Sequence, residues 1–275
     1  MYVVFHPAGE NGIQHSSVMA VIEDTFHPRP LSHWHPTQVG GGRLVLLDDG
    51  LRLLMAGARR DAYSDAQIDD YTGRARRRFP WRPPLRMTVR ARASGELAGT
   101  AGFGFWNNPF SPLGGAPALP AALWFFCGSP PSDMPLALGV PGHGWKAACI
   151  DATRPAALAW APLTLPVLLA NRVPALYRRI WLRVQRGLRV AEAAITALGQ
   201  HWSEYTIEWR VDGARFLVDG AVVLATDRPP RGPLGFVAWV DNQWMVATPH
   251  GRFGWGLLQA DAHWLDLALV RIEPF

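Results

Sequence analysis

The stretch His201–Gly220, HWSEYTIEWRVDGARFLVDG, decides the fold. Its apolar residues Tyr205, Ile207 and Trp209 alternate with polar ones, and this period of two predicts a strand with one buried face. Asp212-Gly213 is a hairpin signal, because glycine accepts the positive φ that tight turns require. A return strand and a second Asp-Gly pair follow directly. The stretch is therefore predicted to be a β-meander with its aromatic side chains on one face.

Further strands are predicted on both sides of this meander. Asp48-Asp49-Gly50 joins two short apolar runs as a hairpin, and residues 85–93 alternate between apolar and largely basic side chains. The run 122–127 is continuously apolar, as expected of a strand covered on both faces. Residues 57–70 are polar and are expected to form a loop. The remaining strands are predicted at 43–47, 51–56, 71–79, 99–106, 145–150, 234–240 and 264–272.

One segment departs from the strand pattern. From Leu176 to Leu198 apolar residues recur at helical spacing, arginines fill much of the rest, and Gly199 is a natural stop. We expect a helical insertion near 155–198 that packs on the sandwich. The alternative is an amphipathic helix that lies on a membrane surface with an arginine face. The chain 1–275 is predicted to be a single all-β domain, an antiparallel β-sandwich that carries this insertion.

Composition bounds the class of protein. With 275 residues, 49% hydrophobic and 18% charged, the chain is globular. The basic residues behind the net charge of +5 are mostly scattered, so no nucleic-acid partner is expected. No apolar run is long enough to span a bilayer and no signal-peptide pattern is visible, which predicts a cytoplasmic protein.

Cysteine and histidine give little sign of a metal centre. Cys127 and Cys149 are too few for a disulfide framework or a zinc site, and we expect them to be buried thiols. His33 and His35 would share a face of a strand, but no third ligand is visible and nearby prolines favour a loop. The sequence therefore predicts no metal and no cofactor.

Several short motifs occur in an order that resembles a known family. An Asp-x-Phe and a Trp at 24–34, a Gly-Leu-x-Leu hairpin at 50–53 and an Arg-x-Arg strand end at 90–92 precede the opening stretch, and 266–272 closes the chain. This order resembles the laminarinase-like glycoside hydrolase family sixteen, of the concanavalin A-like lectin and glucanase superfamily. The resemblance covers about residue 23 to the end, without the insertion. It implies a jelly roll whose concave sheet face carries a carbohydrate.

The sequence departs from that family at the catalytic strand. The family reads Glu-x-Asp-x-(x)-Glu there, which places carboxylates on one face at the sugar. The matching strand by order, 122–128, holds no carboxylate, so the resemblance assigns no catalytic residue. Glu208, Asp241 and His201 are the remaining acid–base candidates. Glu204 and Glu208 share a strand face, but roughly 13 Å of backbone separates them, so an outward polar face is favoured.

Two clusters have the chemistry of a sugar site, which typically combines an aromatic platform with amide and carboxylate groups. Both lie at predicted strand ends, so turn formation and core packing are the alternatives for their residues. Trp124 and His201 are expected as neighbours. The ligand-binding candidates are Trp106, Asn107, Asn108, Trp124, Asp241, Asn242 and Trp244.

Three functions fit these features. The first is lectin-like binding of a glycan or glycosylated ligand without hydrolysis. The second is an enzyme on the same scaffold with relocated acid and base residues, acting on a sugar or a compact apolar molecule; a convergent pair of titratable side chains would favour it. The third is a membrane-peripheral structural protein, which predicts an exposed apolar stripe on the helical insertion.

Overall fold

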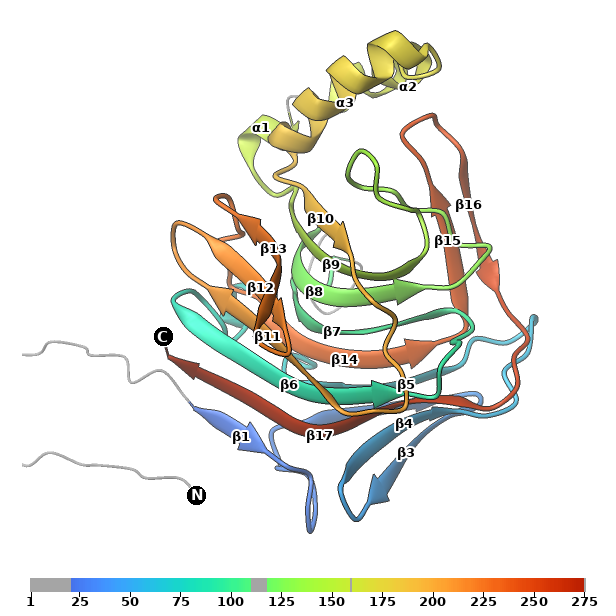
Figure 1. The fold of residues 1–275 in the computed structure, drawn as a ribbon, viewed down its shortest axis with the longest axis vertical. Helices are drawn as coiled ribbons and strands as arrows, with labels where there is room; N and C mark the ends of the chain where they lie inside the picture. Colours follow the sequence, from blue (N-terminus) through green and yellow to red (C-terminus); the bar gives the residue numbers. More distant parts are fainter. Residues whose placement is uncertain (1–20, 110–117, 159, 275) are drawn as a thin grey trace, which may run out of the picture.

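A computed structural model of the chain describes residues 21–109, 118–158 and 160–274 (Figure 1). The first 20 residues, on which the expectation of no signal peptide rests, lie outside the described residues. Two antiparallel sheets pack face to face and form a β-sandwich. The predicted all-β fold with a helical insertion is therefore confirmed.

Within the described residues the first sheet, sheet A, has eight strands and includes the predicted meander. Its strands are β1 (Ile22–Asp24), β3 (Gly42–Leu47), β4 (Gly50–Met55), β6 (Leu85–Ala93), β11 (Ser203–Trp209), β12 (Ala214–Val218), β13 (Ala221–Thr226) and β17 (His263–Pro274). They follow the order β13-β12-β11-β6-β17-β4-β3, with β1 paired to β17. The stretch that decided the fold thus forms one end of this sheet.

The second sheet, sheet B, has seven strands in the part of the chain that the structure describes, and a separate hairpin follows it in the chain. Its strands are β2 (His35–Val39), β5 (Asp65–Asp69), β7 (Thr100–Trp106), β8 (Ala121–Gly128), β9 (Gly144–Asp151), β10 (Ala191–Ala194) and β14 (Gly235–Asp241). Their order is β10-β9-β8-β7-β14-β5-β2. The hairpin pairs β15 (Gln243–Ala247) with β16 (Phe253–Leu257) and stands beside the sandwich (Figure 1).

Alternating residues of both sheets build the core between them. Phe103 and Phe125 of sheet B meet Tyr205 of sheet A at ring-centroid distances of 5.3 and 5.2 Å. Trp209 is fully buried against Phe105, and its indole donates to a loop carbonyl. The period of two in β11 therefore places its aromatic residues in the core, as the sequence predicted.

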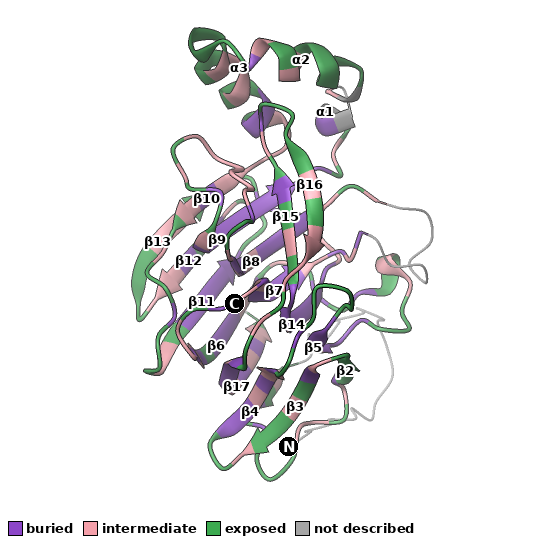
Figure 2. Ribbon diagram, turned by 90° about the vertical axis from the view of Figure 1, so that its right-hand side faces the viewer, coloured by how far each residue is buried: buried purple, intermediate pink, exposed green. Residues whose placement is uncertain are grey.

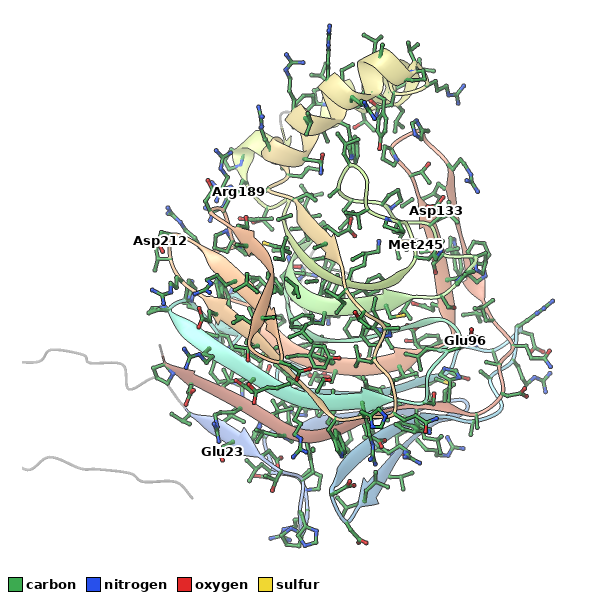
Figure 3. The ribbon with its side chains drawn as sticks, in the orientation of Figure 1. Glu23, Glu96, Asp133, Arg189, Asp212 and Met245 are labelled. Carbon is green, nitrogen blue, oxygen red and sulfur yellow. The ribbon has the colours of Figure 1, made fainter. Side chains whose placement is uncertain are left out.

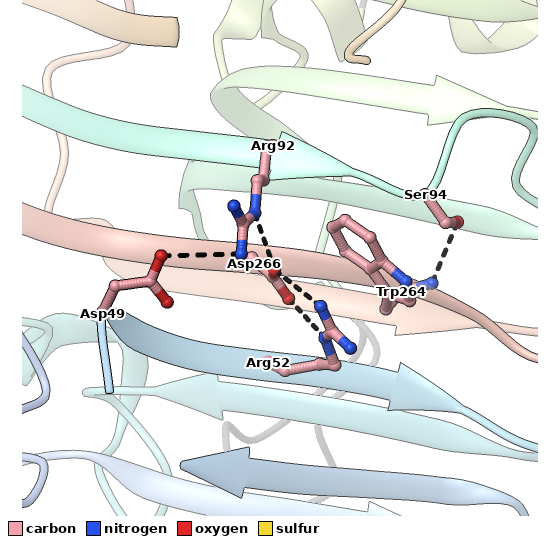
Figure 4. Close-up of polar contacts among 6 residues, drawn as sticks. All are labelled: Asp49, Arg52, Arg92, Ser94, Trp264 and Asp266. Atoms are coloured by element: carbon pink, nitrogen blue, oxygen red, sulfur yellow. Dashed lines mark hydrogen bonds and ion pairs between the residues drawn. The ribbon is translucent and has the colours of Figure 1, made fainter. Parts of the chain in front are cut away.

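Motif residues of the family resemblance act as anchors in this structure. Asp266 of β17 is fully buried and accepts hydrogen bonds from the guanidinium groups of Arg52 and Arg92 (Figure 4). Asp49 lies 3.6 Å from Arg92, and Trp264 packs against Arg52. These charges tie β4, β6 and β17 together on the outer face of sheet A.

The sequence prediction was wrong between residues 57 and 79. Residues 65–69, expected to be a loop, form β5, and its Ala66 and Ile68 face the core. Residues 71–79, expected to be a strand, contain a short 3-10 helix at Arg76–Arg78. Hydrogen bonds from the backbone N–H groups of Tyr71 and Thr72 to the Asp69 carboxylate end β5 and start the turn that leads to this 3-10 helix.

The insertion is helical over a shorter range than predicted. It contains α1 (Pro155–Leu158), a 3-10 turn (Ala161–Leu163), α2 (Thr164–Ala170) and α3 (Pro174–Gly187). Arg189 has a φ of 52° and the Val190 N–H bonds the Gln185 carbonyl at 2.8 Å, so the helix ends there rather than at Gly199. Residues 191–194 then form β10, which pairs with β9. Among the described helices, none combines the length and apolar character needed to cross a bilayer.

Candidate functional site

The open face of sheet B, which points away from sheet A, carries a cluster of aromatic rings. Trp106 lies on β7, Trp124 and Phe126 on β8, and Trp239 on β14, and each ring is half-buried. Trp124 is central, with ring centroids 5.9 Å from Trp106, 5.7 Å from Phe126 and 5.6 Å from Trp239. We call these four residues the aromatic cluster.

Strand alternation and two glycines explain the cluster. Leu123, Phe125 and Cys127 face the core, so the intervening Trp124 and Phe126 face outward. Between β8 and β14, strand β7 presents Gly102 and Gly104 on this face. A Cβ at Gly102 would lie 2.8 Å from the ring of Trp239. The bare backbone of β7 therefore lets the rings of β8 and β14 meet above it.

Polar groups line the flank of the cluster on β14 and β5. The indole of Trp239 donates to the Thr100 hydroxyl at 3.0 Å, and this hydroxyl donates to Asp241 at 2.7 Å. Gln67 of β5 pairs in register with Trp239 and is half-exposed. The indole of Trp106 donates to the Tyr71 hydroxyl at 2.8 Å. A ligand on the rings therefore has hydrogen-bonding groups beside it.

A pair of buried carboxyl groups lies at the end of this flank, where β5 and β14 pair. Asp65 of β5 and Asp241 of β14 are register partners, and each is 5% exposed. One Asp241 oxygen accepts from the Thr100 and Gln243 backbones, whereas Asp65 Oδ1 has no hydrogen-bond partner in the described part of the chain. This orphaned oxygen is an unused acceptor, or a donor when it carries a proton.

Burial controls the protonation of this pair. Burial raises the pKa of Asp65 to about 8, the charge of Asp241 adds to the rise, and a hydrogen bond with Tyr63 opposes it. Burial also raises the pKa of Asp241 to about 7, against hydrogen bonds from Thr100 and Gln243. Carboxyl groups that keep a proton near neutral pH are suited to general acid–base chemistry.

The opposite edge of the open face is closed by a buried ion pair. Lys146 of β9 lies 2.9 Å from Glu192 of β10, and both side chains are almost fully buried. The Lys146 amine also donates to the Met134 carbonyl, and Glu192 accepts from the backbones of Leu136 and Ala137. The pair therefore fixes the β8–β9 connection through these contacts.

The structure separates the predicted ligand-binding residues into two groups. Trp106 and Trp124 lie in the aromatic cluster, and Asp241 belongs to the carboxyl pair at its flank. Asn107 instead bonds the backbones of Leu119 and Ala121. Asn108 has a φ of 41° and its carbonyl accepts from Arg76, so both asparagines shape a turn.

The remaining predicted residues lie away from the cluster. Asn242 is fully buried and its side chain bonds four backbone groups, so it holds loops together. Trp244 packs over Gly254 and Gly256 within the hairpin. Glu208 lies on the outer face of sheet A in ion pairs with arginines, and His201 is exposed before β11.

Four residues of the face were missed at the sequence level, although alternation points to them. Phe126 and Trp239 are the outward partners of core residues in their strands. Asp65 and Gln67 were assigned to a loop because their segment is rich in charge. Alternation with Ala66 and Ile68 was the available signal, but two small apolar residues are a weak one.

Among the described residues, neither a reactive thiol nor a set of metal ligands is found on the open face of sheet B. Cys127 and Cys149 are buried, as predicted, and burial raises the pKa of Cys127 to about 12. In residues 21–109, 118–158 and 160–274 no three His, Cys, Asp or Glu side chains are placed to hold a metal ion.

Comparisons with known proteins agree on the architecture. No protein-family model matches the chain, and no curated protein matches its sequence. A family sixteen glycoside hydrolase of Bacteroides ovatus, solved with the product G4G4G3G, covers 91% of this chain and 99% of its own at 10% identity and a TM-score of 0.52. The match to the transglycosylase Crh5, solved with NAG, covers 94% of this chain and 85% of Crh5, at 12% identity and a TM-score of 0.50. The match to the carbohydrate recognition domain of Emp47p covers 92% of this chain and 94% of that domain, at 11% identity and a TM-score of 0.50.

These likenesses span nearly the whole of each chain. The chain has the concanavalin A-like jelly-roll fold. At identities of 10–12% the likeness establishes the fold alone. What the open face of this jelly roll binds must therefore be argued from its own side chains.

Proposed function

We propose that the aromatic cluster and its polar flank bind a carbohydrate or the sugar portion of a glycosylated ligand. The observation that carries this proposal is the row of half-exposed rings on the open face of sheet B. Indole faces offer apolar area with rigid geometry, while Gln67 supplies amide hydrogen bonds beside them. The glucan product and NAG in the similar structures support a sugar as the ligand class.

Binding without the family's hydrolysis fits the chemistry of β8. The resemblance places catalytic carboxylates on this strand, and here its outward positions 122, 124, 126 and 128 carry Ala, Trp, Phe and Gly. Aromatic faces cannot attack an anomeric carbon or donate a proton to a leaving group. The strand therefore contributes a stacking surface rather than a nucleophile and acid.

A glycan screen read by thermal shift tests this proposal. A ligand at 100 times its dissociation constant stabilises the folded state by about 2.7 kcal/mol. We expect a sugar to raise the melting temperature of the wild type and to lose most of this effect in Trp124→Ala. The matched control is Trp202→Ala, because Trp202 stacks on Arg92 at the other sheet. Equal shifts in both variants, or no shift with any glycan, would contradict the proposal.

A second candidate, an enzyme with relocated carboxyl groups, is favoured by the orphaned oxygen of Asp65. Register partners in an antiparallel sheet have Cβ atoms about 4.5–5.5 Å apart, so the carboxyls of Asp65 and Asp241 can reach the spacing of about 5–5.5 Å in retaining hydrolases. Turnover of a sugar that binds, lost in both Asp65→Asn and Asp241→Asn, would establish the enzyme. Binding without turnover would leave the lectin-like function.

A further inference from the structure

The helical insertion presents an apolar surface that no described residue covers. Leu165 is 66% exposed and Leu169 52%, and α2 has no buried residue. Figure 2 shows α2 and most of α3 exposed above the sandwich. We call this set the insertion surface; it consists of Leu163, Leu165, Leu169, Val173, Leu176 and Leu182.

The β15–β16 hairpin, whose tip meets the insertion, also carries exposed aromatic side chains. Phe253 is 75% exposed and Trp255 67%. Trp255 is the register partner of Met245, which is also exposed, so these side chains share the outer face of the hairpin. Trp244 fills the other face against Gly254 and Gly256. The hairpin is therefore complete without Phe253 and Trp255, which contribute no core packing.

Hydrogen bonds join the hairpin tip to the insertion. The Asn171 side chain donates to the Pro249 carbonyl at 2.8 Å, and the His250 ring lies 2.8 Å from the Asn171 carbonyl. The His250 ring also packs on Tyr177 of α3, with centroids 4.6 Å apart. Figure 1 shows the hairpin reaching α2 at this point. The two exposed apolar regions are thus held in one fixed arrangement.

The charge of the insertion is uniformly positive. Between Asp151 and Glu192 the chain contains seven arginines and no acidic residue. Arg179, Arg183 and Arg186 lie three or four residues apart on exposed turns of α3, where like charges repel. No ion pair to these three side chains is formed within the described residues. Arg189 adds a further positive charge at the base of the insertion (Figure 3). An anionic partner would relieve this repulsion.

We propose that the insertion surface and the hairpin dock the protein on an anionic lipid bilayer. Leucine, phenylalanine and tryptophan suit the boundary between headgroups and acyl chains, and arginines suit lipid phosphates. The helices lie on the bilayer, because none of the described ones is long enough to cross it. This attachment uses a different surface from the aromatic cluster and goes beyond carbohydrate binding.

Vesicle sedimentation tests the proposal with the full chain. We expect the wild type to sediment with vesicles of phosphatidylcholine and phosphatidylglycerol, and much less with phosphatidylcholine alone. Arg179→Gln/Arg183→Gln should weaken binding to the anionic vesicles by about tenfold or more. Phe253→Ser/Trp255→Ser should weaken it comparably, because buried apolar area is lost. Added salt should weaken the wild type, since it screens charge.

Matched controls separate docking from general surface effects. Arg60→Gln removes an exposed arginine, and Val211→Ser/Val222→Ser removes exposed apolar side chains of the sandwich; both should bind as the wild type does. All substituted residues are exposed, and thermal melts verify folding. Sedimentation that is absent, or equal in every variant, would overturn the proposal. So would a dimer in light scattering that Phe253→Ser/Trp255→Ser dissolves while vesicle binding stays unchanged.

Discussion

Burial and a like-charged neighbour together raise the pKa of the Asp65 side chain. Its carboxyl faces Tyr63 on its own segment, Asp69 on its strand and Asp241 on β14. The folded pKa of about 8 lies above the ordinary value of 3.8. The folded state therefore binds a proton that the unfolded state has lost, and this group lowers stability as pH rises from about 4 to about 8.

Asp65→Asn should remove that pH dependence. At about pH 3.5 the variant and the wild type should melt at similar temperatures, because residue 65 is then largely neutral in both the folded and the unfolded state. At pH 9 the variant should melt several degrees higher, at about 2–4 °C for each kcal/mol of relieved charge burial. Thermal melts at both pH values provide the measurement, with Asp61→Asn at an exposed ion pair as control. A parallel decline of Asp65→Asn and the wild type would show that Asp65 is not the source.

At the scale of the strand, β7 leaves room for the aromatic cluster because its outward residues Gly102 and Gly104 have no side chains. At Gly102 a new Cβ would collide with the Phe125 carbonyl and lie 2.8 Å from the Trp239 ring. Gly102→Ala should therefore strain β8, push the Trp239 ring away from the Trp124 ring and destabilise the protein by about 1–3 kcal/mol. Sugar affinity should fall with it. Urea unfolding and the glycan assay measure both effects. Gly199→Ala, where nothing lies within 4 Å of the new Cβ, should change neither; equal effects of the two substitutions would contradict the role of Gly102.

The β9–β10 edge depends on its ion pair. Lys146→Met should destabilise the protein by about 3–5 kcal/mol, because the buried Glu192 carboxylate loses its partner. The double substitution Lys146→Met/Glu192→Gln should recover most of this loss, as no charge then stays buried. Urea unfolding measures both, and Arg271→Met at the exposed pair with Glu23 should cost less than about 1 kcal/mol. A double variant as unstable as the single one would refute this explanation.

Alternation predicted the elements whose two faces differ strongly. It found β11 and β6, where large apolar and polar residues alternate. It could also have identified Phe126 and Trp239 as outward residues, because their neighbours in the strands face the core. It failed at β5, whose buried Asp65 and Asp69 resemble a loop in sequence but are held by neighbouring strands. It also extended the helix beyond Gly187, because the left-handed turn that ends α3 falls on Arg189, a residue type that gives no stop signal in sequence.

For the whole molecule, one asparagine links the sandwich's hairpin to the helical insertion. Asn171 is 1% exposed and bonds Pro249, while its carbonyl meets His250. Asn171→Ala should leave both parts folded but let them move apart. Amide hydrogen exchange should accelerate in α2 and at the hairpin tip and stay unchanged in β6, β8 and β14, because local opening does not require the core to unfold. Arg172→Gln, at the exposed neighbouring residue, is the control. If exchange rose throughout the sheets, Asn171 would instead support the whole sandwich. If it rose nowhere, the His250 contacts with the residue 171 carbonyl and with Tyr177 would be sufficient to hold the insertion.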